Sequence, residues 1–196
     1  RLHEGHWDKK NLTGVEIFGK TLGVIGLGKI GSHVAKVAKA MGMNIIVYDP
    51  FAREEIVKEL DAKLVKDLKD FWHEPDFITI HVPKTKETVD LINKDTIAQM
   101  KKGVRIVNCA RGGVVNEKDL REALDNDYVT GAALDVFCDE KDITTSPLYG
   151  CEKNLVMTPH LGATTYEAQI RVAEDVATQI KIVLQGGKTQ NAVNKI

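Results

Sequence analysis

Residues 21–31 read TLGVIGLGKIG, a short apolar run followed by a glycine-rich turn. The run Thr21–Ile25 predicts a buried parallel strand, and apolar residues recur at helical spacing from Lys29 onward. A strand, a glycine turn and a helix in this order predict a dinucleotide-binding unit, in which a pyrophosphate lies on the N–H groups at the start of the helix. The glycines of the motif stand at positions 26, 28 and 31.

Each glycine of this motif has its own predicted role. Gly26 permits the tight turn, Gly28 lets the backbone approach the pyrophosphate, and Gly31 lets the helix pack closely on the strand. The helix that follows is expected to bury one apolar face. That face is expected to consist of Ile30, Val34, Val37, Ala38 and Met41.

A second apolar run, Asn44–Tyr48, ends in Asp49. An acidic residue at this point of a dinucleotide-binding unit accepts hydrogen bonds from the adenosine ribose and repels a 2′-phosphate. The sequence therefore predicts NAD as the cofactor. Arg53 is close enough in sequence to leave NADP as an alternative.

The composition is typical of a globular protein, with 43% hydrophobic and 28% charged residues in a chain of 196, which is long enough to bury a substantial core. A net charge of −1 and the lack of a long apolar run indicate neither a nucleic-acid partner nor a membrane partner. Cys109, Cys138 and Cys151 lack the spacing of a disulfide framework or a metal site, so we expect no metal and a reducing, cytoplasmic location. The chain opens at Arg1, which suggests a fragment.

Strands and helices alternate along the chain, which predicts an α/β fold with a doubly wound parallel sheet of the Rossmann type. The simplest interpretation is one cofactor domain over 1–196, with a lead-in arm at 1–20 and a final helix at 165–186. A capping box of Thr164 and Glu167 is expected to start that helix. Further strands are expected at 62–65, 76–81, 103–110, 129–134 and 155–157, and further helices at 53–60, 67–72, 93–100 and 116–126.

Polar residues fall at the predicted carboxyl ends of the strands, where doubly wound sheets bind their ligands. They are Asp49, His81, Arg111, Asp135 and His160. The planar guanidinium of Arg111 is suited to gripping a substrate carboxylate through two parallel hydrogen bonds, with a surface ion pair as the alternative. Asp135 is placed to accept a hydrogen bond from the nicotinamide carboxamide.

His160 is the candidate acid/base, because imidazole exchanges a proton near neutral pH. A purely structural histidine is the alternative. A carboxylate beside the ring would orient it and raise its pKa. Glu140, Asp139 and Asp142 all lie on the loop after the strand at 129–134, and spacing alone does not choose among them.

Six strings together resemble the D-isomer-specific 2-hydroxyacid dehydrogenase family, over most of the chain. They are GKTLGVIGLGKIG (19–31), VYDP (47–50), HVPKTKET (81–88), KKGVRIVNCARGG (101–113), GAALDVF (131–137) and TPHLGATTYEA (158–168). The resemblance implies hydride transfer between a 2-hydroxy acid and NAD. It further implies that Arg111 holds the substrate carboxylate, His160 exchanges the hydroxyl proton, and Glu140 is the partner of His160.

The same resemblance implies a set of NAD contacts and a homodimer formed through the cofactor domain. The implied contacts are Gly26, Gly28, Lys29, Ile30, Gly31, Asp49, Val82, Pro83, Cys109, Ala110, Arg111, Asp135, His160, Gly162 and Ala163. Within the family, NCARGG and TPHLGATTYEAQ are most similar to members that oxidise 3-phosphoglycerate. A glyoxylate or hydroxypyruvate reductase and an NAD-sensing module similar to the family's corepressors are the alternatives.

Members of the family also have a substrate domain, built from an N-terminal segment of their chains and a returning helix. The present sequence matches the cofactor part. We therefore expect this chain to bind NAD and to turn over slowly or not at all by itself, because closure of the second domain orients the substrate and excludes water.

Overall fold

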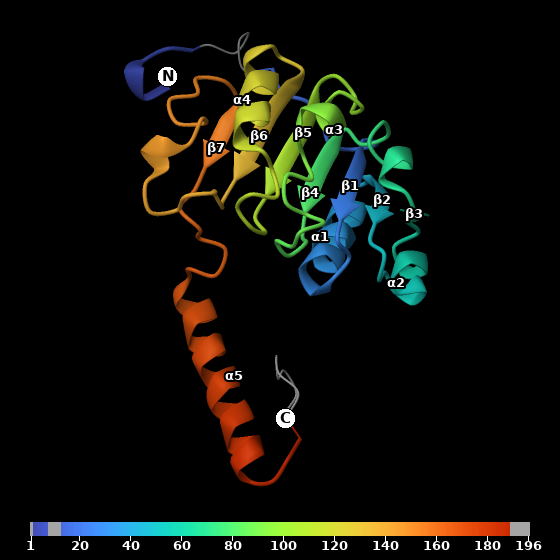
Figure 1. Ribbon diagram of the computed structural model, residues 1–196, viewed down its shortest axis with the longest axis vertical. Helices are drawn as coiled ribbons and strands as arrows, with labels where there is room; N and C mark the ends of the chain where they lie inside the picture. Colours follow the sequence, from blue (N-terminus) through green and yellow to red (C-terminus); the bar gives the residue numbers. More distant parts are fainter. Residues whose placement is uncertain (1, 8–12, 189–196) are drawn as a thin grey trace. The chain divides into compact units, whose positions relative to one another are not determined.

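The computed structural model describes residues 2–7 and 13–188 (Figure 1). The chain divides into two compact units, Arg1–Met157 and Thr158–Ile196, which are described separately below. Within the described residues, no helix combines the length and the apolar character that a membrane span needs.

The first unit is built on a seven-stranded sheet in which every neighbouring pair is parallel. The strands lie in the order β3-β2-β1-β4-β5-β6-β7, which Figure 1 shows as a twisted fan. The order reverses beside β1, which gives the sheet the switch point of a doubly wound fold. The predicted Rossmann architecture is confirmed. The strands are β1 (Thr21–Ile25), β2 (Asn44–Tyr48), β3 (Lys63–Val65), β4 (Phe77–Ile80), β5 (Val104–Asn108), β6 (Val129–Leu134) and β7 (Leu155–Met157).

Helices cover both faces of this sheet. Val24 and Ile25 are adjacent and both fully buried, and they belong to different hydrophobic clusters because successive strand residues point to opposite faces. The cluster of Val24 includes residues of α1 and α2, and that of Ile25 includes residues of α3 and α4. The helices are α1 (Lys29–Ala40), α2 (Glu54–Glu59), α3 (Lys94–Ile97), α4 (Glu117–Asp125) and α5 (Tyr166–Leu184), with 3-10 turns η1 (Leu2–Glu4), η3 (Leu68–Asp70) and η4 (Ile143–Thr145).

The predicted buried face of α1 is wrong for Ile30, Val37 and Met41, which are 48–69% exposed. The helix instead buries Gly31 together with two alanines at helical spacing. A Cβ on Gly31 would lie only 2.0 Å from the carbonyl oxygen of Gly26. This close backbone contact sets the rotation of the helix, so its larger apolar side chains point outward.

Two predicted helices are shorter than expected. The segment at 93–100 forms only α3, whose N-cap is Asn93. The helix ends because the N–H groups of Gln99 and Met100 donate to carbonyls three residues back, not four. The segment at 67–72 forms only the 3-10 turn η3, capped by Asp67.

In the second unit, the predicted capping box at Thr164 is displaced by one residue. Thr165 is the N-cap of α5, and its hydroxyl accepts a hydrogen bond from the Ala168 N–H at 3.1 Å. The Thr164 N–H donates to the Leu161 carbonyl in the preceding turn, which separates it from the helix.

Candidate active site

The glycine turn joins β1 to α1 at the carboxyl edge of the sheet. Gly26 has φ +92°, and a Cβ there would lie 2.7 Å from the carbonyl oxygen of His81. Gly28 differs, because no atom lies within 4 Å of where its Cβ would be. Gly28 is the N-cap of α1, no side chain caps this end, and the first turn holds no acidic residue. The helix start is therefore open to an anion, which its N–H groups and dipole favour.

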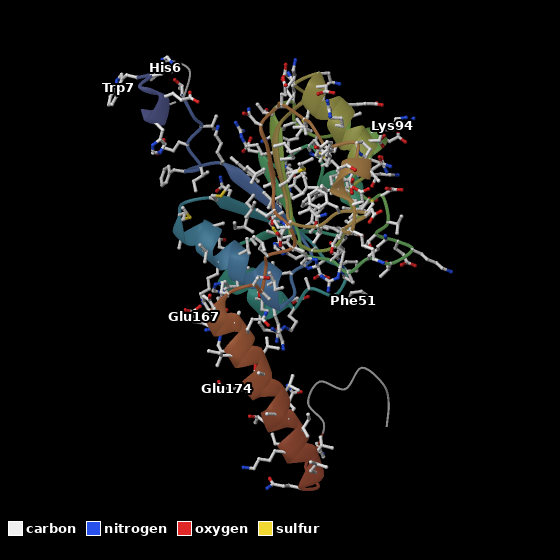
Figure 2. All side chains as sticks on the ribbon, turned by 90° about the vertical axis from the view of Figure 1, so that its left-hand side faces the viewer. His6, Trp7, Phe51, Lys94, Glu167 and Glu174 are labelled. Carbon is white, nitrogen blue, oxygen red and sulfur yellow. The ribbon has the colours of Figure 1, made fainter. Side chains whose placement is uncertain are left out.

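Asp49 is fixed at the end of β2 by two backbone hydrogen bonds. Its Oδ2 accepts from the Leu27 N–H at 2.6 Å, and its Oδ1 accepts from the Phe51 N–H at 2.7 Å. Leu27 belongs to the glycine turn, so the carboxylate is held against that turn. An ionised carboxylate has about four acceptor positions, which leaves room for two ribose hydroxyls. The Phe51 ring beside it is 91% exposed, on the surface of the unit (Figure 2).

His81 follows the last residue of β4 and packs against the glycine turn. Its Nε2 is 2.9 Å from the Thr79 hydroxyl, and burial lowers the pKa of His81. A Cβ on Gly31 would come within 3.3 Å of its ring. The imidazole is thus a neutral packing group. Val82, the next residue, also touches the turn, since its Cγ1 would be 2.9 Å from a Cβ on Gly26.

This lowered pKa predicts a pH dependence of folding. The unfolded imidazole takes up a proton near its ordinary pKa of 6.5, and the folded one resists protonation to lower pH. The stability contributed by neutral His81 is present above that value and is lost as the pH falls below it. Denaturant unfolding between pH 8 and 5 should show a smaller loss for His81→Gln than for the parent chain. Equal losses in the two chains would contradict this assignment.

Asn108, which the sequence analysis missed, organises the turn that carries Arg111. The side chain is 1% exposed at the end of β5. Its Nδ2 donates to the Arg111 carbonyl and its Oδ1 accepts from the Ala110 N–H, both at 3.0 Å. Its own carbonyl accepts from the Asp135 N–H at 3.0 Å, which ties this turn to the buried Asp135 after β6. The available signal was a polar residue at the last position of the strand.

The Arg111 side chain is exposed, and it forms no ion pair within residues 2–7 and 13–188. Its Nη1 donates to the Ala110 carbonyl at 2.6 Å. Gly112 passes so close to Phe137 that a Cβ would lie 1.8 Å from the Phe137 carbonyl oxygen. Partial burial, and then the Asp135 carboxylate, raise the pKa of the neighbouring Cys109. That thiol is protonated at neutral pH, so it is not poised to act as a nucleophile.

Glu117 of α4 anchors the loop that carries Glu140. It is 6% exposed, and it accepts hydrogen bonds from the Cys138 N–H at 2.7 Å and from the Ser146 hydroxyl. Burial and the Glu117 carboxylate raise the pKa of Cys138 to about 11. Asp139 and Asp142 accept hydrogen bonds from N–H groups of the same loop, at 2.9–3.3 Å. These two carboxylates therefore shape the backbone of the loop that carries Glu140.

The second unit holds His160, Gly162 and Ala163. His160 has φ +55°, a left-handed conformation that is uncommon for any residue other than glycine. Its N–H donates to the Thr158 carbonyl at 3.1 Å. Backbone strain of this kind costs about 1–3 kcal/mol and clusters at functional sites.

Within the first unit, the fold places most of the predicted site residues after the carboxyl ends of neighbouring strands. These are Gly26, Gly28, Lys29, Ile30, Gly31, Asp49, Val82, Pro83, Cys109, Ala110, Arg111 and Asp135. In the described part of the chain, no group of three or more His, Cys, Asp or Glu residues is arranged to hold a metal ion.

Known proteins are similar to this chain in both sequence and fold. The family model described as D-isomer specific 2-hydroxyacid dehydrogenase, NAD binding domain, matches residues 1–162. The D-3-phosphoglycerate dehydrogenase of Synechocystis sp. is 51% identical over 193 residues, which are 98% of this chain and 34% of that protein. The D-3-phosphoglycerate dehydrogenase of Rattus norvegicus is 42% identical over 193 residues, which are 98% of this chain and 36% of that protein. The chain thus spans about a third of the length of these curated relatives.

Solved structures of dehydrogenases also match the fold of this chain. D-lactate dehydrogenase from Escherichia coli superposes with a TM-score of 0.86 at 32% identity, over 99% of this chain and 60% of that one. D-lactate dehydrogenase from Aquifex aeolicus, solved with NAD and lactic acid, has a TM-score of 0.83 at 34% identity, over 95% of this chain and 60% of that one. The open helix start and the anchored Asp49 fit NAD. The chain belongs to the D-isomer-specific 2-hydroxyacid dehydrogenase family and contains its NAD-binding domain.

Proposed function

We propose that this chain is the cofactor part of an NAD-dependent D-3-phosphoglycerate dehydrogenase, which oxidises 3-phosphoglycerate to 3-phosphohydroxypyruvate. The observation that carries the cofactor half of the proposal is the anchored Asp49 carboxylate beside an open helix start. The substrate half is supported by curated relatives of that name at 42–51% identity. By itself, the chain is expected to bind NAD and to turn over slowly.

The proposed chemistry assigns one task to each polar group. Bound NAD would accept the hydride from the substrate carbon. The guanidinium of Arg111, exposed on a turn fixed by Asn108, would hold the substrate carboxylate. His160 would take the hydroxyl proton, and Glu140 would orient the imidazole and stabilise its charged form.

Arg111→Lys tests the substrate role of Arg111. Lysine keeps the positive charge and loses the planar fork, so we expect substrate affinity to fall at least about tenfold and NAD affinity to fall much less. The measurement is calorimetric titration of 3-phosphohydroxypyruvate into the NADH-loaded chain. Glyoxylate and hydroxypyruvate titrated in parallel distinguish the reductase alternative. Equal affinity for all three acids, or an unaffected Arg111→Lys variant, would contradict the proposal.

We also propose that the chain pairs with a second copy through its cofactor domain. Two exposed apolar side chains lie beside the start of the sheet. Phe18 is 70% exposed and Met41 is 55% exposed. The Phe18 ring packs on Gly42, at the place where a Cβ on that glycine would be. On the lead-in arm, Trp7 is 84% exposed and projects outward (Figure 2).

Sedimentation equilibrium should show a dimer that Phe18→Ser weakens at least about tenfold, because an apolar ring is lost from the contact. Phe51→Ser is the matched control, since Phe51 is an even more exposed phenylalanine, at 91% against 70% for Phe18, but lies at the cofactor edge. A monomeric parent chain, or equal weakening by both variants, would refute the pairing.

A further inference from the structure

A pocket lies at the amino-terminal edge of the sheet, opposite the edge that carries the glycine turn. It has a volume of about 170 Å³ and is formed where β1, β4 and β5 begin. Strands of this length place it roughly 15 Å from the carboxyl edge. Its charged lining consists of Lys20, Asp76, Lys101, Lys102 and Arg105.

The charge of this pocket is unlike that of the whole chain. Four cations face one carboxylate, which leaves three positive charges in excess in a chain whose net charge is −1. Cations gathered in a concave site attract anions more strongly than the same charges spread over a surface.

The single carboxylate is already engaged. Asp76 accepts from the Thr21 N–H at 2.8 Å and from the Lys101 ammonium at 3.1 Å. Burial by itself would raise the pKa of Asp76, but these hydrogen bonds and the charges of Lys101 and Lys20 hold it below its ordinary value. Asp76 therefore stays ionised and joins β4 to β1, and it neutralises chiefly Lys101.

Two of the other cations, Arg105 and Lys102, are not neutralised by a carboxylate within the described residues. The Arg105 guanidinium lies over the Phe77 ring, 5.2 Å from the ring centroid, and donates to the Gly103 carbonyl at 3.3 Å. Gly103 has φ +90°, which makes the turn that carries Lys102 into the pocket lining. Within the described part of the chain, neither Arg105 nor Lys102 forms an ion pair.

We propose that this pocket binds a compact polyvalent oxyanion of the phosphate class, held by Lys20, Lys102 and Arg105. Ammonium and guanidinium groups form charge-assisted hydrogen bonds with phosphate oxygens, and stacking on Phe77 holds the guanidinium plane ready for two of them. The volume suits a single phosphate or a pyrophosphate, since sites for larger ligands measure about 300–1,000 Å³. The site is separate from the glycine turn that binds the cofactor, and it does not depend on the proposed reaction.

The test is an amide NMR titration of the chain with inorganic phosphate, then with pyrophosphate, at constant ionic strength and with saturating NAD. We expect saturable shifts at the amides of Thr21, Gly103 and Arg105. Lys102→Gln should weaken binding roughly tenfold through loss of one charge. Lys58→Gln, at an exposed lysine of α2, is the matched control and should change nothing.

The outcomes separate the possibilities. Tighter binding of pyrophosphate than of phosphate identifies a polyphosphate group as the ligand, and equal binding identifies a single phosphate. Shifts that do not saturate, equal losses in both lysine variants, or shifts confined to the amides of 28–31 would overturn the proposal. Failure of NAD to bind would refute the proposed function. In that case, the amides that shift with phosphate would still show whether the anion binds in this pocket.

Discussion

Gly31→Ala is expected to weaken NAD binding strongly and to destabilise the first unit. The added methyl group would lie 2.0 Å from the Gly26 carbonyl oxygen, which is backbone and cannot rotate away. Relief requires α1 to move off the glycine turn, at a cost of about 1–3 kcal/mol or more. Because a displacement of about 1 Å in a binding site can cost about a hundredfold, NAD affinity should fall at least that much. Calorimetric titration and denaturant unfolding measure the two effects.

Gly28→Ala provides the matched comparison for this result. Gly28 has φ −70°, which alanine adopts readily, and nothing lies within 4 Å of the added carbon. It should therefore destabilise the chain far less than Gly31→Ala does, with only the modest cost of alanine at an N-cap. Its NAD affinity should fall because the methyl group occupies the space over the helix start. If Gly31→Ala kept both stability and affinity, the assignment of the close helix contact to Gly31 would be wrong.

Asn108→Leu is expected to have the second large effect, by releasing the turn that carries Arg111. Leucine fills a similar volume but leaves the Ala110 N–H and the Arg111 carbonyl without their partner. An unsatisfied group costs about 1–3 kcal/mol when it is buried, and the two groups here lie in part-buried hydrogen bonds. We expect a loss of about 2–4 kcal/mol in the free energy of unfolding, together with weaker binding of substrate to the NADH-loaded chain.

The control for Asn108 is Asn44→Ala, because Asn44 is an exposed amide whose side chain, among the residues that the structure describes, donates only to the Gly19 carbonyl at 3.2 Å. It should change stability by less than about 0.5 kcal/mol. Similar losses for Asn44→Ala and Asn108→Leu would show that the buried amide has no special role.

The sheet was predictable because its strands are short apolar runs bounded by polar residues and glycines. Asn44–Tyr48 and Val129–Leu134 match the predicted strands at both ends. The rotation of α1 was not predictable from apolar spacing, because it depends on a backbone contact between Gly31 and Gly26. The start of α5 was displaced because Thr164 and Thr165 are both good caps, and only the preceding turn chooses between them.

The site residues that could be predicted are those whose residue type has a single chemical use at that point of the sequence pattern. Asp49 after an apolar strand and the three glycines of the turn are of this kind. The supporting residues were harder to find, because their partners are distant in sequence. Asp49 is held by Leu27, and Glu117 holds the backbone at Cys138. Asn108 acts on its neighbours, but its role depends on burial that the sequence does not show.

The most direct test of the account is calorimetric titration of the chain with NAD and with NADP, repeated on Asp49→Asn. Asparagine keeps an oxygen for the Leu27 N–H and removes the negative charge. The account predicts saturable NAD binding, NADP binding at least about tenfold weaker, and loss of most of that preference in Asp49→Asn. Equal affinity for the two nucleotides in the parent chain, or an unchanged preference in Asp49→Asn, would contradict the central claim that the anchored carboxylate selects NAD.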